Sequence, residues 1–221
     1  VKRILERGIK ADPTIPEGHY NLGRYFVRTG DTEQAKTALI NALAMFDAAK
    51  KKSRERTLKH IDTYRLLGER YIAEQEYLLA EKQYAEGISL FEQRREYTGL
   101  TSDKNVGKLY ADMADIDYFI SGDIQTAFRN YKSAVENGYD TPSVRYRIGF
   151  VQYTDGKYAE ALGSFIKTAS EDASNRNLLL ALGNVLSIRG DQAAARGYYE
   201  RLIRILDSDR ERFDILFPQV R

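Results

Sequence analysis

The chain has 221 residues, of which 43% are hydrophobic and 30% are charged, and this composition is typical of a folded protein rather than a disordered one. Its 34 basic and 32 acidic residues leave a net charge of +2, which argues against a dedicated nucleic-acid-binding domain, because such domains carry a basic excess. The absence of cysteine excludes disulfides, thiolate metal sites and cysteine nucleophiles. No apolar run of about 18 residues occurs, so no membrane span is predicted.

The chain begins at Val1 without an initiator Met and without a signal-peptide pattern. We therefore expect a fragment of a longer protein whose targeting signal lies elsewhere. The lack of cysteine fits a cytoplasmic and a periplasmic location equally well.

A repeated pattern organises most of the chain. The stretch RTGDTEQAKTALINAL at residues 28–43 has a Gly at its third position and an Ala at its eighth, and the same spacing returns at 120–135, 154–169 and 188–203. The last three copies start 34 residues apart. Helix-forming residues fill the segments between glycines and only four prolines occur, so the fixed period predicts a helical repeat protein.

The first complete copy shows why each position is occupied as it is. Gly23 follows Leu22, where a missing side chain lets two helices cross closely. Gly30 can take the left-handed conformation that ends a helix. Asp31 is then a good N-cap for the next helix, and Gln34 completes a pair like a capping box. The inner face of that helix continues through small and apolar residues at helical spacing, Ala35, Leu39 and Ala42.

These residues resemble the tetratricopeptide repeat (TPR), whose signature is an aromatic, Leu-Gly, an aromatic, a downstream Ala and aromatic, and a closing Pro. The resemblance covers nearly the whole chain and implies an all-α, right-handed superhelical solenoid of antiparallel helix pairs. It predicts a half-repeat at residues 1–15 and five repeats at 16–60, 61–107, 108–141, 142–175 and 176–207. A capping helix or the start of a further repeat is expected at 208–221. In general style the array is also similar to the TPR segment of spirochaete flagellar collar proteins.

The repeats depart from the pattern at several places. Gln75 stands where the second repeat should have its turn glycine, and the third repeat has Ala114 and Asp115 in place of Leu-Gly. Extra residues follow the first two repeats. We expect the first insertion, 47–60, to lengthen a helix, and the second, 92–105, to be a loop, because it contains Gly99, Thr101, Ser102 and Asp103.

No catalytic, metal or cofactor site is predicted. We expect His19 to be a partly buried packing residue and His60 to be exposed, and neither has a second ligand at metal-binding spacing. Asp115 and Asp117 are two residues apart on a helix and therefore point to different faces. The GK pairs lack the flanking residues of a phosphate loop. The basic run from Lys50 to Lys59 either binds an acidic partner, anionic lipid or nucleic acid or is a solvated helix extension, and solvated charge runs are the commoner case.

In TPR domains, residues of the first helix of each pair line a concave groove. The resemblance places Asp62, Arg65 and Glu69 there in the second repeat, and charged residues also in the first. Aromatic side chains, which are favoured as binding hot spots, dominate repeats three and four. The predicted partner-binding residues are Tyr20, Arg24, Arg65, Ile116, Phe119, Tyr146, Phe150, Tyr153 and Asn184. A carboxylate clamp of the co-chaperone type is not predicted, since its Lys and Asn positions hold other residues.

The function that follows is a non-catalytic protein-interaction scaffold, a segment of a larger assembly protein, that binds a protein or peptide partner and no small-molecule substrate. Some of the predicted groove residues could instead pack against neighbouring repeats. Two other functions stay open: a docking or regulatory arm of a larger enzyme, and a homo-oligomerisation module that buries the aromatic surface.

Overall fold

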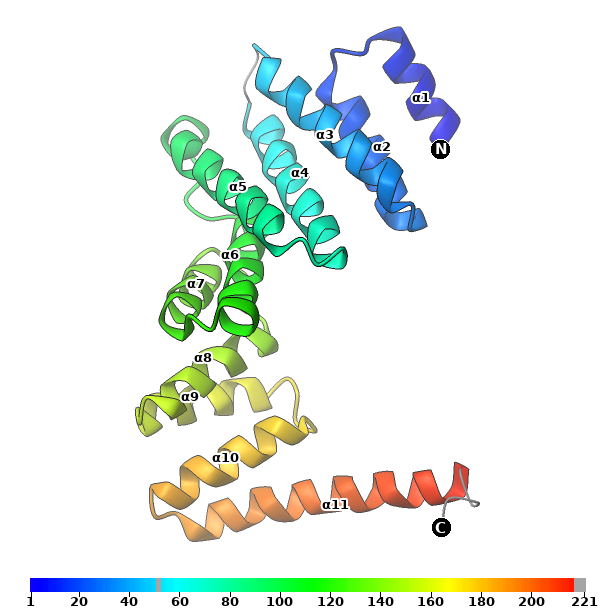
Figure 1. Cartoon of the computed structure of the whole chain (residues 1–221). Coiled ribbons are helices and arrows are strands. Elements are labelled where there is room, and N and C mark those ends of the chain that lie inside the picture. The colour runs from blue at the N-terminus through cyan, green and yellow to red at the C-terminus, as the bar shows by residue number, and fades with distance from the viewer. Residues whose placement is uncertain (51–52, 217–221) are drawn as a thin grey trace. The chain divides into compact units, whose positions relative to one another are not determined.

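The computed structural model describes residues 1–50 and 53–216, with side chains described for 1–50, 53–96 and 99–209. Every regular element within these ranges is a helix (Figure 1). In chain order the elements are α1 (Lys2–Ala11), α2 (Pro16–Thr29), α3 (Thr32–Ala48), α4 (Arg54–Ala73), α5 (Tyr77–Thr98), α6 (Lys104–Ile116), the π-helix η1 (Asp117–Ser121), α7 (Ile124–Glu136), α8 (Pro142–Thr154), α9 (Tyr158–Ala169), α10 (Arg176–Ile188) and α11 (Gln192–Leu216).

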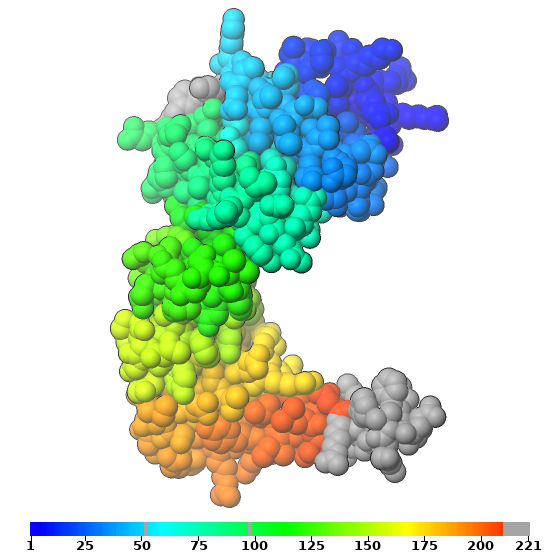
Figure 2. Space-filling model, in the orientation of Figure 1, coloured from blue at the N-terminus to red at the C-terminus, as the bar shows by residue number. Residues whose placement is uncertain are grey.

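Consecutive helices pack as antiparallel pairs, α2 with α3, α4 with α5, α6 with α7, α8 with α9 and α10 with α11 (Figure 1). This arrangement confirms the predicted all-α fold of antiparallel helix pairs. The helices belong to two compact units, Val1–Tyr139 (unit 1) and Asp140–Arg221 (unit 2). Within unit 1, α1 packs against α2 at the N-terminal end (Figure 2).

The predicted turn signals start and stop the helices as expected. Gly30 has φ 77° and ends α2 in the left-handed conformation. The Asp31 carboxylate accepts a hydrogen bond from the backbone N–H of Gln34 at 3.1 Å, and the Gln34 side chain donates to the same carboxylate at 2.6 Å. Asp123 and Asp191 accept equivalent bonds at the starts of α7 and α11. The repeated Gly-Asp pair is therefore a helix stop followed by a helix start.

The Leu-Gly positions are contact points within the pairs. A Cβ added at Gly68 of α4 would lie 2.2 Å from Cε1 of Tyr84 on α5, and Tyr84 is 1% exposed. Each buried large side chain of this kind contributes about 1.5–3 kcal/mol. The glycine thus lets an aromatic ring fill the space between two helices.

Both insertions lengthen helices. In the first, α4 begins at Arg54, so a helix extension is present as predicted, although Lys51 and Lys52 lie outside the described residues. The loop predicted over 92–105 is wrong for most of that range, because α5 continues to Thr98 and α6 begins at Lys104. Gly99, with φ 64°, marks the real end of α5.

The C-terminal segment differs from the prediction as well. Figure 1 shows α11 running back along α10 and continuing past the start of α10, and residues 208–216 are part of that single helix. A separate capping helix therefore does not begin at Ser208. The spacing of Ser208 and Glu211 is that of a capping box, but a Ser and Glu three residues apart are equally compatible with an uninterrupted helix. Residues 217–221 are outside the described part.

Candidate protein-interaction surface

Two hollows lie on the side of α2, α4 and α6 that carries the predicted groove residues of unit 1. The first hollow has a volume of about 470 Å³, and its charged lining comprises Arg24, Arg28, Glu55, Lys59, Asp62 and Arg65. The second hollow has a volume of about 360 Å³ and a mixed lining of Glu69, Ile72, Tyr77, Tyr84, Lys108, Asp112, Asp115, Ile116, Phe119 and Ile120. Arg65 and Glu69, one turn apart on α4, stand at the border between them.

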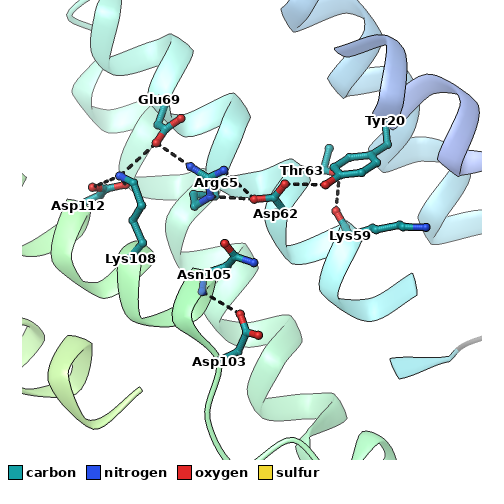
Figure 3. Close-up of polar contacts among 10 residues, drawn as sticks. All are labelled: Tyr20, Lys59, Asp62, Thr63, Arg65, Glu69, Asp103, Asn105, Lys108 and Asp112. Carbon is teal, nitrogen blue, oxygen red and sulfur yellow. Dashed lines mark hydrogen bonds and ion pairs between the residues drawn. The ribbon is translucent and has the colours of Figure 1, made fainter. Parts of the chain in front are cut away.

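A chain of polar contacts fixes the surface between the hollows (Figure 3). The Tyr20 hydroxyl on α2 donates to Asp62 on α4 at 2.7 Å. The Arg65 guanidinium donates to Asp62 at 2.9 Å and to Glu69 at 2.7 Å. Asp62, Arg65 and Glu69 are spaced three and four residues apart, which places them on one face of the helix. The network therefore joins two helices through alternating charges.

The same network continues to α6. The Lys108 ammonium lies 3.1 Å from Glu69 and 2.8 Å from Asp112 (Figure 3). Burial by itself would lower the pKa of Lys108, but Asp112 and Glu69 outweigh it and raise that pKa. Burial raises the pKa of Asp112, against the opposing effect of Lys108. Burial, with the Asp62 charge beside the hydroxyl, also raises the pKa of Tyr20.

The first hollow has an excess of positive charge. Glu55 pairs with Lys59 at 2.6 Å, and Asp62 pairs with Arg65. The Arg24 guanidinium lies 5.5 Å from the centre of the Tyr20 ring. Within the described part of the chain, Arg24 and Arg28 have no carboxylate in ion-pair contact. Both arginines consequently remain available to an anionic group.

The second hollow combines an apolar wall with carboxylates. Phe119 and Ile120 belong to η1 and are 55% and 51% exposed, whereas Ile116 is only 4% exposed. Of the two predicted groove residues in this repeat, Ile116 therefore lies in the core of unit 1 and Phe119 lies at its surface. A π-helix is uncommon and often occurs at functional positions.

The predicted residues of unit 2 form a row of half-buried rings on α8. Tyr146 packs against Phe165 with ring centres 5.7 Å apart, Phe150 lies 6.2 Å from Tyr146, and Tyr153 lies 6.3 Å from Phe150. These rings rest on the buried core of unit 2 and keep only part of their surface exposed. Asn184 accepts a hydrogen bond from the Tyr199 hydroxyl at 2.8 Å. These residues therefore make packing contacts within unit 2, and a partner-binding role for them stays a prediction.

Some contributors to the surface were missed. Lys108 is not among the predicted groove residues, and its neighbour Leu109 is 0% exposed and belongs to the core. Glu55 and Lys59 reach the first hollow from the extended start of α4. The i, i+4 spacing of Lys108 and Asp112 was the available signal, because such pairs commonly form ion pairs on one helix face.

The prediction of an exposed His60 is wrong. Its side chain is 1% exposed and stacks between the rings of Phe46 and Tyr64, at centre distances of 5.0 and 5.2 Å. Its Nε2 lies 3.5 Å from an Asp47 carboxylate oxygen. His19 is partly buried as predicted, with Nε2 2.9 Å from the Pro13 carbonyl oxygen.

Two residues of the basic run, Arg56 and Lys59, form ion pairs. Arg56 binds Glu17 at 2.7 Å, and Lys59 binds Glu55.

In the described ranges no helix is long and apolar enough to cross a membrane, and no three His, Cys, Asp or Glu side chains gather in an arrangement suited to a metal.

The tetratricopeptide repeat family model matches residues 146–210. Similar solved structures include YrrB, a TPR protein with an unusual peptide-binding site, at 15% identity, TM-score 0.69 and 93% coverage of both chains. BtubC from P. vanneervenii is 18% identical, with TM-score 0.67 and coverage of 95% of this chain and 88% of that one. PilF from Pseudomonas aeruginosa is 18% identical, with TM-score 0.57 and 92% coverage of both chains.

These likenesses establish a TPR-type fold. Among curated protein sequences no significant match is found. The similarity to flagellar collar proteins is untested by these comparisons and stays a prediction.

Proposed function

We propose that this chain is a non-catalytic interaction scaffold, a segment of a larger assembly protein, and that it binds a peptide or helix of a partner protein on the surface formed by α2, α4 and α6. The observation that carries the proposal is the pair of adjoining hollows on that surface, with volumes of about 470 and 360 Å³. Hollows of this size accommodate single side chains or short segments of a partner. We also propose a further contact surface on unit 2, made of Tyr146, Phe150, Tyr153 and Asn184.

The rigidity of the polar network supports this function. Asp62, Arg65 and Glu69 are held by bonds of 2.7–2.9 Å, so little side-chain freedom remains to be lost when a partner binds. Phe119 supplies a large exposed ring, and rings of this kind are favoured at binding hot spots. The fold is shared with YrrB, whose structure contains a peptide-binding site.

The bonding of the carboxylates supports a non-catalytic role. Asp62, Glu69 and Asp112 are each engaged by a cationic side chain, and Asp115 accepts a hydrogen bond from the Tyr131 hydroxyl at 2.5 Å. A general base needs a carboxylate directed at a reacting group. These carboxylates serve to hold neighbouring side chains in place.

Selection from a random peptide display library against the whole chain tests the proposal. We expect enriched peptides whose affinity for the variant Arg24→Ala/Phe119→Ala is about tenfold lower or more, because truncating hot-spot residues commonly costs at least that much. The matched control is Arg7→Ala/Ile40→Ala, in which the altered residues are exposed and lie outside both hollows. Circular dichroism checks that both variants fold. No enrichment, or equal binding to both variants, would overturn the proposal.

A further inference from the structure

We infer that the two hollows together bind one charge-polarised peptide, with acidic residues in the first hollow and an apolar residue next to a basic residue in the second. The inference rests on the proposed function and specifies the chemistry of the partner. Its evidence is the opposite charge balance of two hollows that share a border within unit 1.

The first hollow has four cationic and two acidic side chains in its lining. Arg24 and Arg28 are four residues apart on α2, and like charges at this spacing destabilise a helix slightly. Arg28 lies in the last turn of α2, where the helix dipole favours a cation. Arg24 lies a full turn earlier and receives little of that benefit. A partner carboxylate between the two guanidinium groups would relieve their repulsion and could accept paired hydrogen bonds.

The second hollow has the opposite balance, with three carboxylates and one ammonium group. Lys108 is shared between Glu69 and Asp112, and Asp115 has no cation in contact within the described ranges. Consistent with this, burial raises the pKa of Asp112, and the charges of Glu69 and Asp115 add to the rise. A basic side chain from a partner would compensate this negative charge.

An apolar wall beside these carboxylates defines the second element of the partner. Ile72, Phe119 and Ile120 line the same hollow, and the last two are about half exposed. A basic side chain buries its aliphatic stem along such a wall while its charged head meets a carboxylate. An apolar neighbour in the peptide adds contact area against Phe119.

A single short segment can occupy both hollows. Arg65 lines the first hollow and Glu69 the second, and residues four apart on a helix face are only about 5–6 Å apart. These two side chains pair with each other at 2.7 Å, so the strip between the hollows is balanced in charge. An extended chain covers that distance in about two residues, at roughly 3.3–3.6 Å per residue.

The charge pattern disfavours uniformly charged partners. A polyanion such as a nucleic acid would be attracted by Arg24 and Arg28 but repelled by Asp112 and Asp115. A uniformly basic peptide would be attracted by Asp112 and Asp115 but repelled by Arg24 and Arg28. Because like-charge contacts cost binding energy, the surface selects a partner with one acidic end and one basic-apolar end.

Fluorescence anisotropy with synthetic peptides tests the inference on the whole chain. The probe has a block of Asp and Glu, a Gly-Ser spacer and a Leu-Leu-Lys-Lys block, and it is made in both chain directions. The comparison peptides are a uniformly acidic one, a uniformly basic one and a scramble of the probe composition. We expect the probe, in one direction, to bind about tenfold tighter than every comparison peptide, and the difference to shrink at high salt.

Protein variants locate the binding. We expect Arg24→Glu/Arg28→Glu to weaken probe binding about tenfold or more, and Asp115→Lys to weaken it through the other hollow. The matched control is Arg3→Glu/Arg7→Glu on α1, which makes the same charge change at the same spacing on exposed residues outside both hollows. A probe whose acidic block is replaced by a basic block should recover affinity for Arg24→Glu/Arg28→Glu.

The outcomes separate the inference from the proposed function. Equal binding of probe and scramble, or equal effects of the α2 and α1 charge reversals, overturns the inference. If library-selected peptides bind the α2–α4–α6 surface but show no charge polarity, the inference fails while the proposed function stands. If no peptide binds in either experiment, both fail.

Discussion

At the residue scale, Gln75 shows where the sequence departs from the repeat pattern and what the departure costs. It is the one non-glycine residue with positive φ in the described ranges, at 63°. Gly30, Gly122, Gly156 and Gly190 occupy the corresponding turns of the other pairs. A side chain in the left-handed region costs about 1–2 kcal/mol, so the turn between α4 and α5 carries this strain.

We therefore expect Gln75→Gly to raise the free energy of unfolding by about 0.5–1 kcal/mol. The gain is smaller than the relieved strain because glycine also gives the unfolded chain more freedom. Urea unfolding measures the change. Gln75→Ala is the control and should give no gain, since alanine keeps the Cβ. A less stable Gln75→Gly variant would show that the side chain of Gln75 contributes more than the strained backbone costs.

His60 shows why some residue predictions fail. The neighbouring Lys and Arg residues suggested an exposed linker, but α4 begins six residues before His60 and turns it toward Phe46 of α3. Local composition carries no information about which face of a lengthened helix meets its neighbour. Gly30 and Asp31, in contrast, act through their own backbone and side chain, and their roles were predictable from the sequence.

At the element scale, the buried Arg145 of α8 forms ion pairs with a residue just before α8 and a residue just after α9. Arg145 is 6% exposed and contacts Asp140 at 2.9 Å and Glu171 at 2.5 Å. Lys167 also binds Asp140, at 2.6 Å. Burial alone would raise the pKa of Asp140, but Lys167 and Arg145 outweigh it and lower that pKa below its usual value of 3.8.

The lowered pKa predicts an acid-sensitive contribution to stability. Because the folded-state pKa lies below the unfolded one, the contribution is complete above about pH 5 and is lost as pH falls through and below 4. We expect Asp140→Asn to lower the free energy of unfolding by about 1–2 kcal/mol at pH 7 and by much less at pH 3. Urea unfolding at both values measures this.

Asp155→Asn is the matched control for this experiment. Its carboxylate meets only the half-exposed ammonium group of Lys157, at 3.4 Å, and not a buried arginine, and pairs with an exposed partner contribute little. Its effect should be small at both pH values. An Asp140→Asn penalty that is the same at pH 7 and pH 3 would contradict the proposed ion-pair contribution.

The helix pairs were predictable, whereas their exact ends and one change of helix type were not. Hydrophobic spacing and Gly-Asp turns indicate where a helix starts and stops. They do not distinguish α from π winding. At the end of η1 the backbone N–H of Gly122 donates to the Asp117 carbonyl, which is the i→i+5 bond of a π-helix, and no residue in this stretch signals that wider turn. The position of Phe119 at the second hollow could therefore be inferred only in outline.

At the scale of the whole molecule, the hydrophobic cores are local. One cluster in unit 1 contains Tyr20, Leu39 and Leu67, and another contains Ile61, Tyr84 and Leu109. The cluster of unit 2 contains Phe165, Leu178 and Leu182. In repeat proteins stability is approximately a sum of repeat and nearest-neighbour contributions, so a core defect should remain local.

Gly149→Ala tests this locality. The added Cβ would lie 2.7 Å from Phe165 Cε1 and 3.0 Å from Ser164 Cβ, and overpacking of this kind costs about 1–3 kcal/mol. We expect amide hydrogen exchange to accelerate in α8 and α9 while α2 to α5 keep their wild-type rates.

Gly163→Ala, in the same helix pair, is the control. Its Cβ meets open space, so it should slow exchange slightly, because alanine favours a helix over glycine by about 0.8–1 kcal/mol. Faster exchange in α2 and α3 of the Gly149→Ala variant would instead mean that the chain opens as one cooperative structure, and a partner bound on the α2–α4–α6 surface would then stabilise unit 2 as well.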